Sequence, residues 1–465
     1  MTRILPLFLP AMLMAQFTPE QLQEDLRIAR QALQEGHEGV YRFTAKADFE
    51  RGFAQAAARL TRPMTAVEFY RVLAPAVALV KCGHTIVNLP LEVQKQLQAS
   101  LLLLPFDVDI LSGRVYILRD FTPAAARAGA EILSINGIPA SKLLAQLEAA
   151  TPGDGNIAVG RWGRLARGGF VRQLSIVAGL ESPYRVTYRP QGTVKAETKE
   201  FAGIAPGQRP VAPAPGADKP LAYLEFPAPK VAVLTIRTFG GFADRARKVP
   251  LGPFLAEAFG EIQAKGAETL ILDLRGNSGG RDALGKQLFA HLTDHDFIYY
   301  QALILNKRSF SFAPYLDRPV EIAGGDVQAR PDGRFDVAHP NIGPQQPAQP
   351  GFRGRVIALA DRDSFSATGE FLTAFHSARR GAIVGEETGA GYTGNTSGDS
   401  ANLTLPHTKL RLGVPLNGYY LPSVRPAARD RGVPPDVPVA LTIAGKLTGR
   451  DPVMERALRL ASEKK

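Results

Sequence analysis

Three segments of the sequence carry residue types that acyl-transfer chemistry needs. Ser366 follows the apolar stretch 356–360, the pair Gly279 and Gly280 follows a second apolar stretch, and His84 stands just before β-favouring residues. A serine hydroxyl becomes a nucleophile when an imidazole accepts its proton. Backbone N–H groups can then hold the oxyanion that forms on the attacked carbonyl. Together the three segments predict a hydrolase of the serine type.

Ser366 is expected at the junction of a strand and a helix, because apolar residues recur at helical spacing after it. Such a junction exposes the hydroxyl beside the free N–H groups and positive dipole end of the helix. A second interpretation is purely structural. Ser366 or Ser364 would then be an N-cap, with Glu370 near the reach of a capping box. These residues alone leave both interpretations open.

The segment Arg275–Gly280 reads Arg-Gly-Asn-Ser-Gly-Gly and follows an apolar strand pattern. Glycines let the backbone approach a ligand closely and turn its N–H groups inward. Gly279 and Gly280 are therefore candidate oxyanion-hole donors. A simple tight strand-to-helix turn would explain the same residues.

His84 lies in the segment Lys81-Cys-Gly-His-Thr85. Histidine is the commonest general base because its ordinary pKa lies near neutral pH, and we expect a rate that rises through a pKa near 7. A lone histidine is also often a surface residue or a satisfied core residue. Its role therefore depends on whether the fold brings it to Ser366.

The elements that must position Ser366 and the glycine loop have an α/β pattern. Continuous apolar runs predict buried strands at 231–236, 269–274 and 356–360, and helical spacing predicts helices at 254–264 and 282–292. Strands alternating with helices imply right-handed crossover units and a parallel sheet. The Pro- and Gly-rich stretch 313–353 is expected to be an irregular insertion.

The remaining segments have other patterns. Helical spacing dominates up to about residue 95. Short β-rich stretches follow at 101–104, 115–118 and 184–188, and Asn136-Gly137 is a hairpin-turn signal. A Pro-, Ala- and Gly-rich stretch then precedes the α/β part. The expected division is 1–15 leader, 16–98 helical domain, 99–202 β-rich domain, 203–222 linker and 223–465 α/β core.

Composition bounds the classes of protein that remain. A chain of 465 residues is expected to form more than one domain. The formal net charge is +11, but the basic residues are scattered, so no nucleic-acid partner is expected. Cys82 is the single cysteine, so an intrachain disulfide is impossible and metal sites built on thiolates are not expected. We expect no metal and no cofactor.

The first residues resemble a secretion signal. Arg3 precedes an apolar run from Ile4 to Ala15, and the small residue Ala15 offers a cleavage site before Gln16. The mature chain is therefore expected to be periplasmic or secreted. The alternative is an N-terminal helix packed on the core. No later apolar run is long enough for a transmembrane segment.

The motifs also occur in an order that resembles a known family. Leu272–Gly280 (LDLRGNSGG), Ser364–Glu370 (SFSATGE) and Ile383–Gly389 (IVGEETG) are similar to motifs of the tail-specific, or carboxy-terminal-processing, serine peptidases. That family includes the tricorn core and the interphotoreceptor retinoid-binding modules. The Cys82-Gly-His-Thr85 segment resembles the Asp-Gly-His-Thr segment of its Ser/His branch.

The resemblance implies a fold and a set of roles. The fold would be a multi-domain α/β protein with a helical N-terminal domain, a PDZ-like β-rich domain and an α/β spiral, crotonase-like core. Ser366 would be the nucleophile and His84 the base. The N–H of Ala367, with that of Gly279 or Gly280, would form the oxyanion hole.

Two features of the pattern differ from the family or stay unassigned. No lysine occurs between Ser366 and Lys409, so the lysine base of the family's Ser/Lys branch is not expected here. A third residue to orient His84 is not readable. Asp430 is a weak candidate, since a carboxylate pairing at the surface with a neighbouring arginine explains it as well.

The resulting expectation is an exported serine peptidase. A PDZ-like part can bind an extended peptide at a sheet edge, which favours a peptide or protein substrate over an ester. A non-catalytic protein that binds a peptide or an apolar ligand is the alternative on the same fold. An acyl-CoA enzyme of the crotonase type is disfavoured, because an exported chain has no access to cytosolic thioesters.

Overall fold

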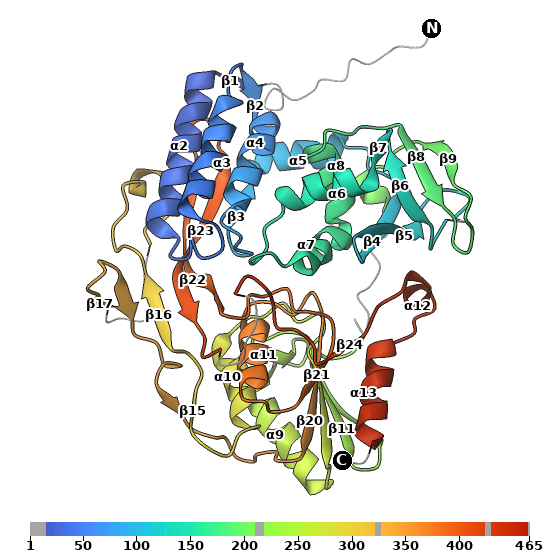
Figure 1. The fold of residues 1–465 in the computed structure, drawn as a ribbon, viewed down its shortest axis with the longest axis vertical. Helices are drawn as coiled ribbons and strands as arrows, with labels where there is room; N and C mark the ends of the chain where they lie inside the picture. The colour runs from blue at the N-terminus through green and yellow to red at the C-terminus, as the bar shows by residue number, and fades with distance from the viewer. Residues whose placement is uncertain (1–14, 126, 210–217, 321–326, 424–428, 464–465) are drawn as a thin grey trace.

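The computed structural model describes residues 15–463 except 126, 210–217, 321–326 and 424–428. Figure 1 shows a group of N-terminal helices beside a β-rich unit, with both lying above an α/β core. The expected multi-domain α/β fold is confirmed. The expected leader lies outside the described residues except for Ala15. Among the described helices, none combines the length and apolarity needed to span a bilayer.

Four helices form the N-terminal unit. Capping boxes at Thr18 and Thr65 start two of them, because each threonine accepts an early N–H while the third helical residue bonds back. Leu22, Phe49 and Phe69 bury the shared apolar faces. The helices are α2 (Pro19–Gly36), α3 (Lys46–Ala58), α4 (Ala66–Ala78) and α5 (Leu91–Ser100), and β1 (Gln16–Phe17) pairs with β2 (Met64–Thr65).

The β-rich unit is an antiparallel sheet with helices packed against it. Asn136 and Gly137, both with positive φ, make the tight turn between β6 and β7. The strands are β4 (Phe106–Leu111), β5 (Arg114–Asp120), β6 (Glu131–Ile135), β7 (Ile138–Pro139), β8 (Tyr184–Arg189) and β9 (Glu197–Phe201). The helices are α6 (Ala140–Ala149), α7 (Ala158–Arg164) and α8 (Phe170–Ile176), with a π-helical turn over Leu165–Gly169.

One strand expectation in this unit is wrong. Residues 101–104 form no strand; Leu103 makes an isolated bridge to Ile204, and β4 begins at Phe106. Leu101 instead caps α5, with its N–H bonded to the carbonyl of Leu97. Apolar residues leaving a helix are therefore indistinguishable from a short strand in the sequence.

The core is a six-stranded sheet in the order β10-β11-β14-β20-β21-β24. Only β10 is antiparallel to its neighbour, and the other pairs are parallel. Because these strands run parallel, their carboxyl ends meet at one edge of the sheet. The strands are β10 (Ala222–Ala228), β11 (Val231–Ile236), β14 (Thr269–Asp273), β20 (Arg355–Ala360), β21 (Ala382–Gly385) and β24 (Val437–Pro438).

Helices cover both faces of this sheet. On one face, α13 (Pro452–Ser462) buries Val453, Ala457 and Leu460 against the strands. On the opposite face lie α9 (Leu251–Ala264), α10 (Asp282–Ala290) and α11 (Ala367–Ser377), as Figure 1 shows. The helix α12 (Ile443–Leu447) precedes α13. Continuous burial of the central strands explains why their sequences are uninterrupted apolar runs.

A second, antiparallel sheet joins the core to the N-terminal unit. Its central strand β23 (Arg411–Tyr420) pairs with β22 (Gly394–Thr404) and β16 (Ala302–Leu305), and also with β3 (Ile86–Asn88) of the helical unit. Val87 stands opposite Leu412 in this pairing. Since β3 follows His84 by two residues, this pairing attaches the histidine segment to the core.

The stretch 313–353 is more regular than expected. It contains β17 (Val327–Ala329) and β18 (Phe335–Val337), which extend the second sheet beyond β16, and β19 (Pro344–Gln345), which pairs with β15 (Phe297–Ile298). The strands are only two or three residues long, too short for an alternating pattern to be visible among the prolines and glycines.

Candidate active site

Ser366 occupies the turn between β20 and α11. Its backbone has φ 53° and ψ −130°, a conformation that costs an L-residue on the order of 1–3 kcal/mol and is found mainly at functional turns. The side chain makes no capping hydrogen bond to α11. Ser364, by contrast, is fully buried, and its hydroxyl donates to the carbonyl of Leu274. The geometry therefore favours Ser366 over Ser364 as the reactive hydroxyl.

The structure places the ring of His84 against the hydroxyl of Ser366. His84 Nε2 and Ser366 Oγ are 3.1 Å apart, although the residues are 282 positions apart in the sequence. This distance lies within the range for transfer of the hydroxyl proton to the ring. The ring also packs on Phe365, with centroids 4.7 Å apart. The two residues expected to do the chemistry are thus in contact.

Arg164 of the β-rich unit contacts the two segments that carry His84 and Ser366. Arg164, at the end of α7, donates to the carbonyl of Gly83 at 3.1 Å and lies over the ring of Phe365 at 4.9 Å. Gly83 has no room for a side chain, because a Cβ there would lie 2.6 Å from the Phe365 ring. Arg164 therefore holds the histidine loop against the serine turn.

The electrostatic environment keeps His84 neutral. Burial lowers the pKa of His84, the positive charge of Arg164 lowers it further, and the negative charge of Asp154 raises it. The net shift is downward from the ordinary value of 6.5. At neutral pH the ring is therefore unprotonated and able to accept a proton. The pKa of His84, which limits the rate at low pH, is therefore expected below 6.5 and not near 7 as the sequence suggested.

The glycine loop after β14 packs directly against the serine turn, because β14 and β20 are parallel neighbours. Gly279 has φ +100°, and a Cβ there would lie 2.7 Å from the Cβ of Ser366 and 2.9 Å from the N of Ala367. The N–H of Phe365 bonds to the carbonyl of Asn277 at 3.1 Å. Only glycine fits at this point of contact.

The hydrogen bonds of the loop distinguish the two candidate donors. The N–H of Gly279 donates to the side-chain oxygen of Asn277 at 2.9 Å. Among the described residues, the N–H groups of Gly280 and Ala367 have no such partner. Ala367 and Gly280 are therefore better candidates than Gly279 for holding an oxyanion, and Gly279 supplies the close approach.

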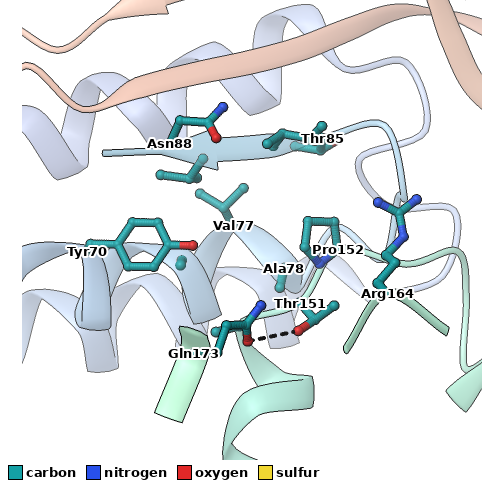
Figure 2. A pocket seen from close by; sticks show the side chains of 13 residues that line it. Tyr70, Val77, Ala78, Thr85, Asn88, Thr151, Pro152, Arg164 and Gln173 are labelled. Carbon is teal, nitrogen blue, oxygen red and sulfur yellow. Dashed lines mark hydrogen bonds between the residues drawn. The ribbon is translucent and has the colours of Figure 1, made fainter. Parts of the chain in front are cut away.

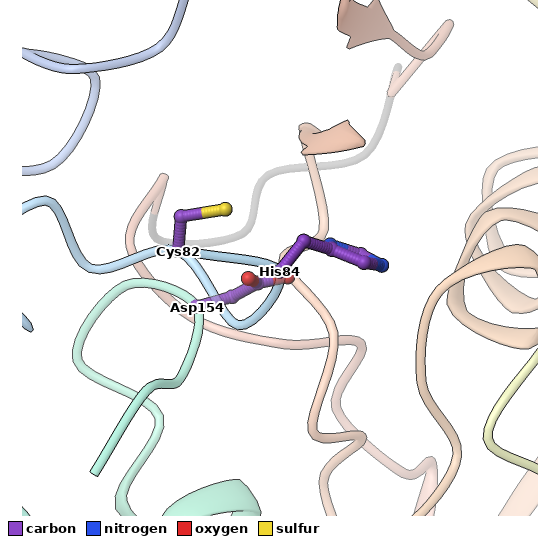
Figure 3. Close-up of side chains that lie close together, drawn as sticks. All are labelled: Cys82, His84 and Asp154. Carbon is purple, nitrogen blue, oxygen red and sulfur yellow. The ribbon is translucent and has the colours of Figure 1, made fainter. Parts of the chain in front are cut away.

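Sequence reasoning missed Asp154, which lies in the loop between α6 and α7. Its side chain is 1% exposed, and its two oxygens accept the N–H groups of Gly83 at 2.7 Å and Gly391 at 3.1 Å. A ring nitrogen of His84 lies within 4.8 Å of the carboxylate (Figure 3). The only sequence signal was a turn motif, Pro152-Gly-Asp-Gly155, which is common in loops.

Asp430, the weak candidate for the third residue, lies elsewhere. Its carbonyl and carboxylate accept from the backbone and side chain of Asn156, at 2.7 and 2.5 Å. Its neighbour Arg431 pairs with Glu387. Asp430 thus supports the loop that carries Asp154 and does not reach the base directly.

Glu370 is part of a buried polar network and not of a capping box. Tyr300 donates to one carboxylate oxygen at 2.5 Å and Asn395 to the other at 2.8 Å. Burial raises the pKa of Glu370 to about 7, against the effect of these hydrogen bonds. The network ties the first turn of α11 to β22 and to the residues before β16.

Two cavities lie beside the segments that carry His84 and Ser366, since Thr85 lines one and Phe365 the other. One has a volume of about 250 Å³ and lies between α4, β3 and residues 150–152, with Val77 and Ala78 on its wall and Gln173 at one end (Figure 2). The other, of about 160 Å³, is lined by Ser278 and Phe365 among others. Arg164 lines both.

Solved structures of similar fold include peptidases. The crystal structure of mature CPAF superposes with a TM-score of 0.62 at 16% identity, covering 95% of this chain and 96% of that one. A putative peptidase from Parabacteroides merdae gives 0.50 at 14% identity, covering 97% and 98%. These likenesses show the fold.

Sequence comparison matches the core to a peptidase family. The putative tricorn protease homolog 2 of Streptomyces coelicolor is 34% identical over 116 residues, which are 24% of this chain and 9% of that much longer protein. Residues 230–439 match the model of peptidase family S41.

The match to this family model and the fold shared with solved peptidases indicate a serine-type peptidase. The part of the chain that matches peptidase family S41 is the core that runs from β11 to β24.

Proposed function

We propose that this chain is an exported peptidase that cleaves peptide bonds with Ser366 as nucleophile and His84 as base. The observation that carries the proposal is the 3.1 Å contact between Ser366 Oγ and His84 Nε2. The two residues come from separate units of the fold, and the β3–β23 pairing brings them together.

The proposed mechanism follows from the positions of the groups. His84 Nε2 takes the proton of Ser366 as Oγ attacks the carbonyl carbon of the substrate. The N–H groups of Ala367 and Gly280, with the N-terminus of α11, stabilise the oxyanion. The imidazolium then protonates the leaving amine, and water hydrolyses the acyl-enzyme by the same route. Asp154 favours the imidazolium through its negative charge.

The proposed partner is a peptide or protein in extended form. The cavities lined by Thr85 and by Phe365, which are sequence neighbours of His84 and Ser366, offer space for its side chains. The PDZ-like character of residues 99–202 remains part of the proposal, as does the absence of a nucleic-acid partner. A non-catalytic binder of peptides or apolar ligands on this fold would not require the strained serine or its contact with an imidazole.

The direct experiment is incubation of the purified chain with an unfolded protein, followed by mass spectrometry of the fragments. The proposal predicts discrete cleavage products that are absent with Ser366→Ala protein. Cleavage that persists in that variant would point to a contaminating peptidase. Intact substrate under all conditions would favour the binding protein.

Asp154→Asn is expected to lower kcat by roughly 10²–10⁴-fold, with a smaller effect on KM, because the charge that favours the imidazolium is lost. The amide also cannot accept both N–H groups that the carboxylate accepts. Steady-state kinetics measures this change, and circular dichroism checks that the variant folds. Asp430→Asn is the matched control and should stay within a few fold of the parent. Equal losses in both variants would mean that Asp154 has only a structural role.

We also propose export, from Arg3 and the apolar run that ends at Ala15. Protein recovered from the envelope fraction or medium should begin at Gln16 by intact-mass measurement. Ala15→Leu should slow processing, because signal peptidases require a small residue there. Recovery of a chain that retains Met1 to Ala15, with no shift in the variant, would contradict export by cleavage.

A further inference from the structure

Three side chains of different metal-ligand types, one of them His84 itself, lie close together beside Ser366. The Sγ of Cys82, a ring nitrogen of His84 and a carboxylate oxygen of Asp154 all lie within 4.8 Å of one another (Figure 3). Cys82 and Asp154 are buried. Thiolate, imidazole and carboxylate are the three side-chain ligands of zinc in proteins. The sequence led us to expect no metal site built on thiolates, but this arrangement needs only one thiolate.

The donor atoms have capacity for a further partner. His84 Nε2 faces Ser366, while Nδ1 is buried without a hydrogen-bond partner among the described residues. Burial and the negative charge of Asp154 raise the pKa of the Cys82 thiol to about 11, against the smaller effect of Thr85. A metal ion must therefore displace the proton that this thiol donates to the carbonyl of Thr396 at 3.3 Å. Each oxygen of Asp154 accepts one N–H and keeps a second lone pair.

We propose that Cys82, His84 Nδ1 and Asp154 form an inhibitory Zn²⁺ site, an inference that rests on the proposed role of His84 as base. The thiol proton leaves to solvent, and water takes the fourth position. Ligands at 2.0–2.3 Å from a tetrahedral ion lie roughly 3.5 Å apart, so the donors must close by about 1 Å.

Charge and chain geometry allow this closure. The thiolate and carboxylate together neutralise the two positive charges of the ion, which limits the cost of placing it in a buried site. Arg164, bonded to the carbonyl of Gly83, is a positive group near the site and weakens the affinity. The ligands lie on two short loops and not within strands, so small displacements do not break the sheets.

Inhibition follows from the tautomer of the ring. A metal ion on Nδ1 of a neutral imidazole leaves the ring proton on Nε2. Nε2 then donates to Ser366 Oγ and cannot accept its proton. Zn²⁺ should therefore lower kcat with little effect on KM, and a chelator should restore activity.

The test uses the full-length mature chain. Zn²⁺ is expected to inhibit the parent reversibly, and Cys82→Ser is expected to keep its uninhibited turnover but need at least tenfold more Zn²⁺, because a ligand is lost. His407→Gln is the matched control: this histidine pairs with Glu24 at the surface and should not alter inhibition. Cys82→Ala serves as a second variant if the serine disturbs folding.

Binding is measured separately from activity with Co²⁺ as the probe. In Ser366→Ala protein, Co²⁺ should give a thiolate-to-metal charge-transfer band that is absent when Cys82 is also replaced. Equal inhibition of the parent and Cys82→Ser, or no such band, would overturn the site. If the band depended on Cys82 but the parent protein showed no peptidase activity, the metal site would be supported and the proposed function would not.

Discussion

Ser366→Ala is expected to lower kcat by about 10⁴–10⁶-fold, to the level that binding and the oxyanion hole alone provide. The hydroxyl is half-buried and makes no capping bond to α11, so its removal should leave the melting temperature nearly unchanged. Alanine must still adopt the positive φ of this turn, which serine already tolerates at similar cost. Peptide hydrolysis and thermal unfolding measured on the same preparation check both expectations.

Ser364→Ala is the matched control for that substitution, because it removes a hydroxyl two residues away. Ser364 is fully buried, and its hydroxyl donates to the carbonyl of Leu274. Its loss should lower the free energy of unfolding by about 1 kcal/mol, with a much smaller effect on turnover. If Ser364→Ala instead abolished hydrolysis while Ser366→Ala retained it, the nucleophile would be assigned to the wrong residue.

His84→Ala is expected to lower kcat by roughly 10³–10⁶-fold, the range seen when a triad base is removed. The parent should also show a pH dependence set by this ring. Because the base must be neutral, activity is full above the pKa of His84 and falls as pH decreases through it. Burial and Arg164 lower this pKa, so the acid limb should lie below pH 6.5.

The pH profile separates His84 from other bases. Arg164→Gln removes a positive charge that lowers the pKa of His84, so the acid limb should move to higher pH. A lysine base would give a limb on the alkaline side. A profile of kcat/KM that does not move in Arg164→Gln protein, or a His84→Ala variant with near-normal turnover, would contradict the role of the ring.

The sequence predicted the local elements of the core well, because buried parallel strands are uninterrupted apolar runs. The strands at 231–236 and 269–273 and the helix that ends at Ala264 occur where expected. The position of Ser366 between strand and helix followed from the same patterns. The strand predicted at 101–104 was wrong because apolar residues that follow a helix and pack into the core have the same sequence pattern as a short strand.

What the sequence could not give was contact between distant loops. The pairing of β3 with β23 brings His84 to the core. Its register is not visible in the sequence, because β3 has only three residues. The role of Asp154 could not be predicted either, because its Pro-Gly-Asp-Gly turn motif is common in loops of every kind. The difference between Gly279 and Gly280 depends on the side chain of Asn277, which no spacing rule predicts.

The most direct measurement is covalent labelling with a serine-directed phosphonate, followed by mass spectrometry of the labelled peptide. The 3.1 Å contact between His84 and Ser366 predicts an adduct on Ser366 in the parent, and almost none in His84→Ala, because the ring must accept the hydroxyl proton. An adduct on Ser364, or labelling of Ser366 that is unaffected by the loss of His84, would contradict the account.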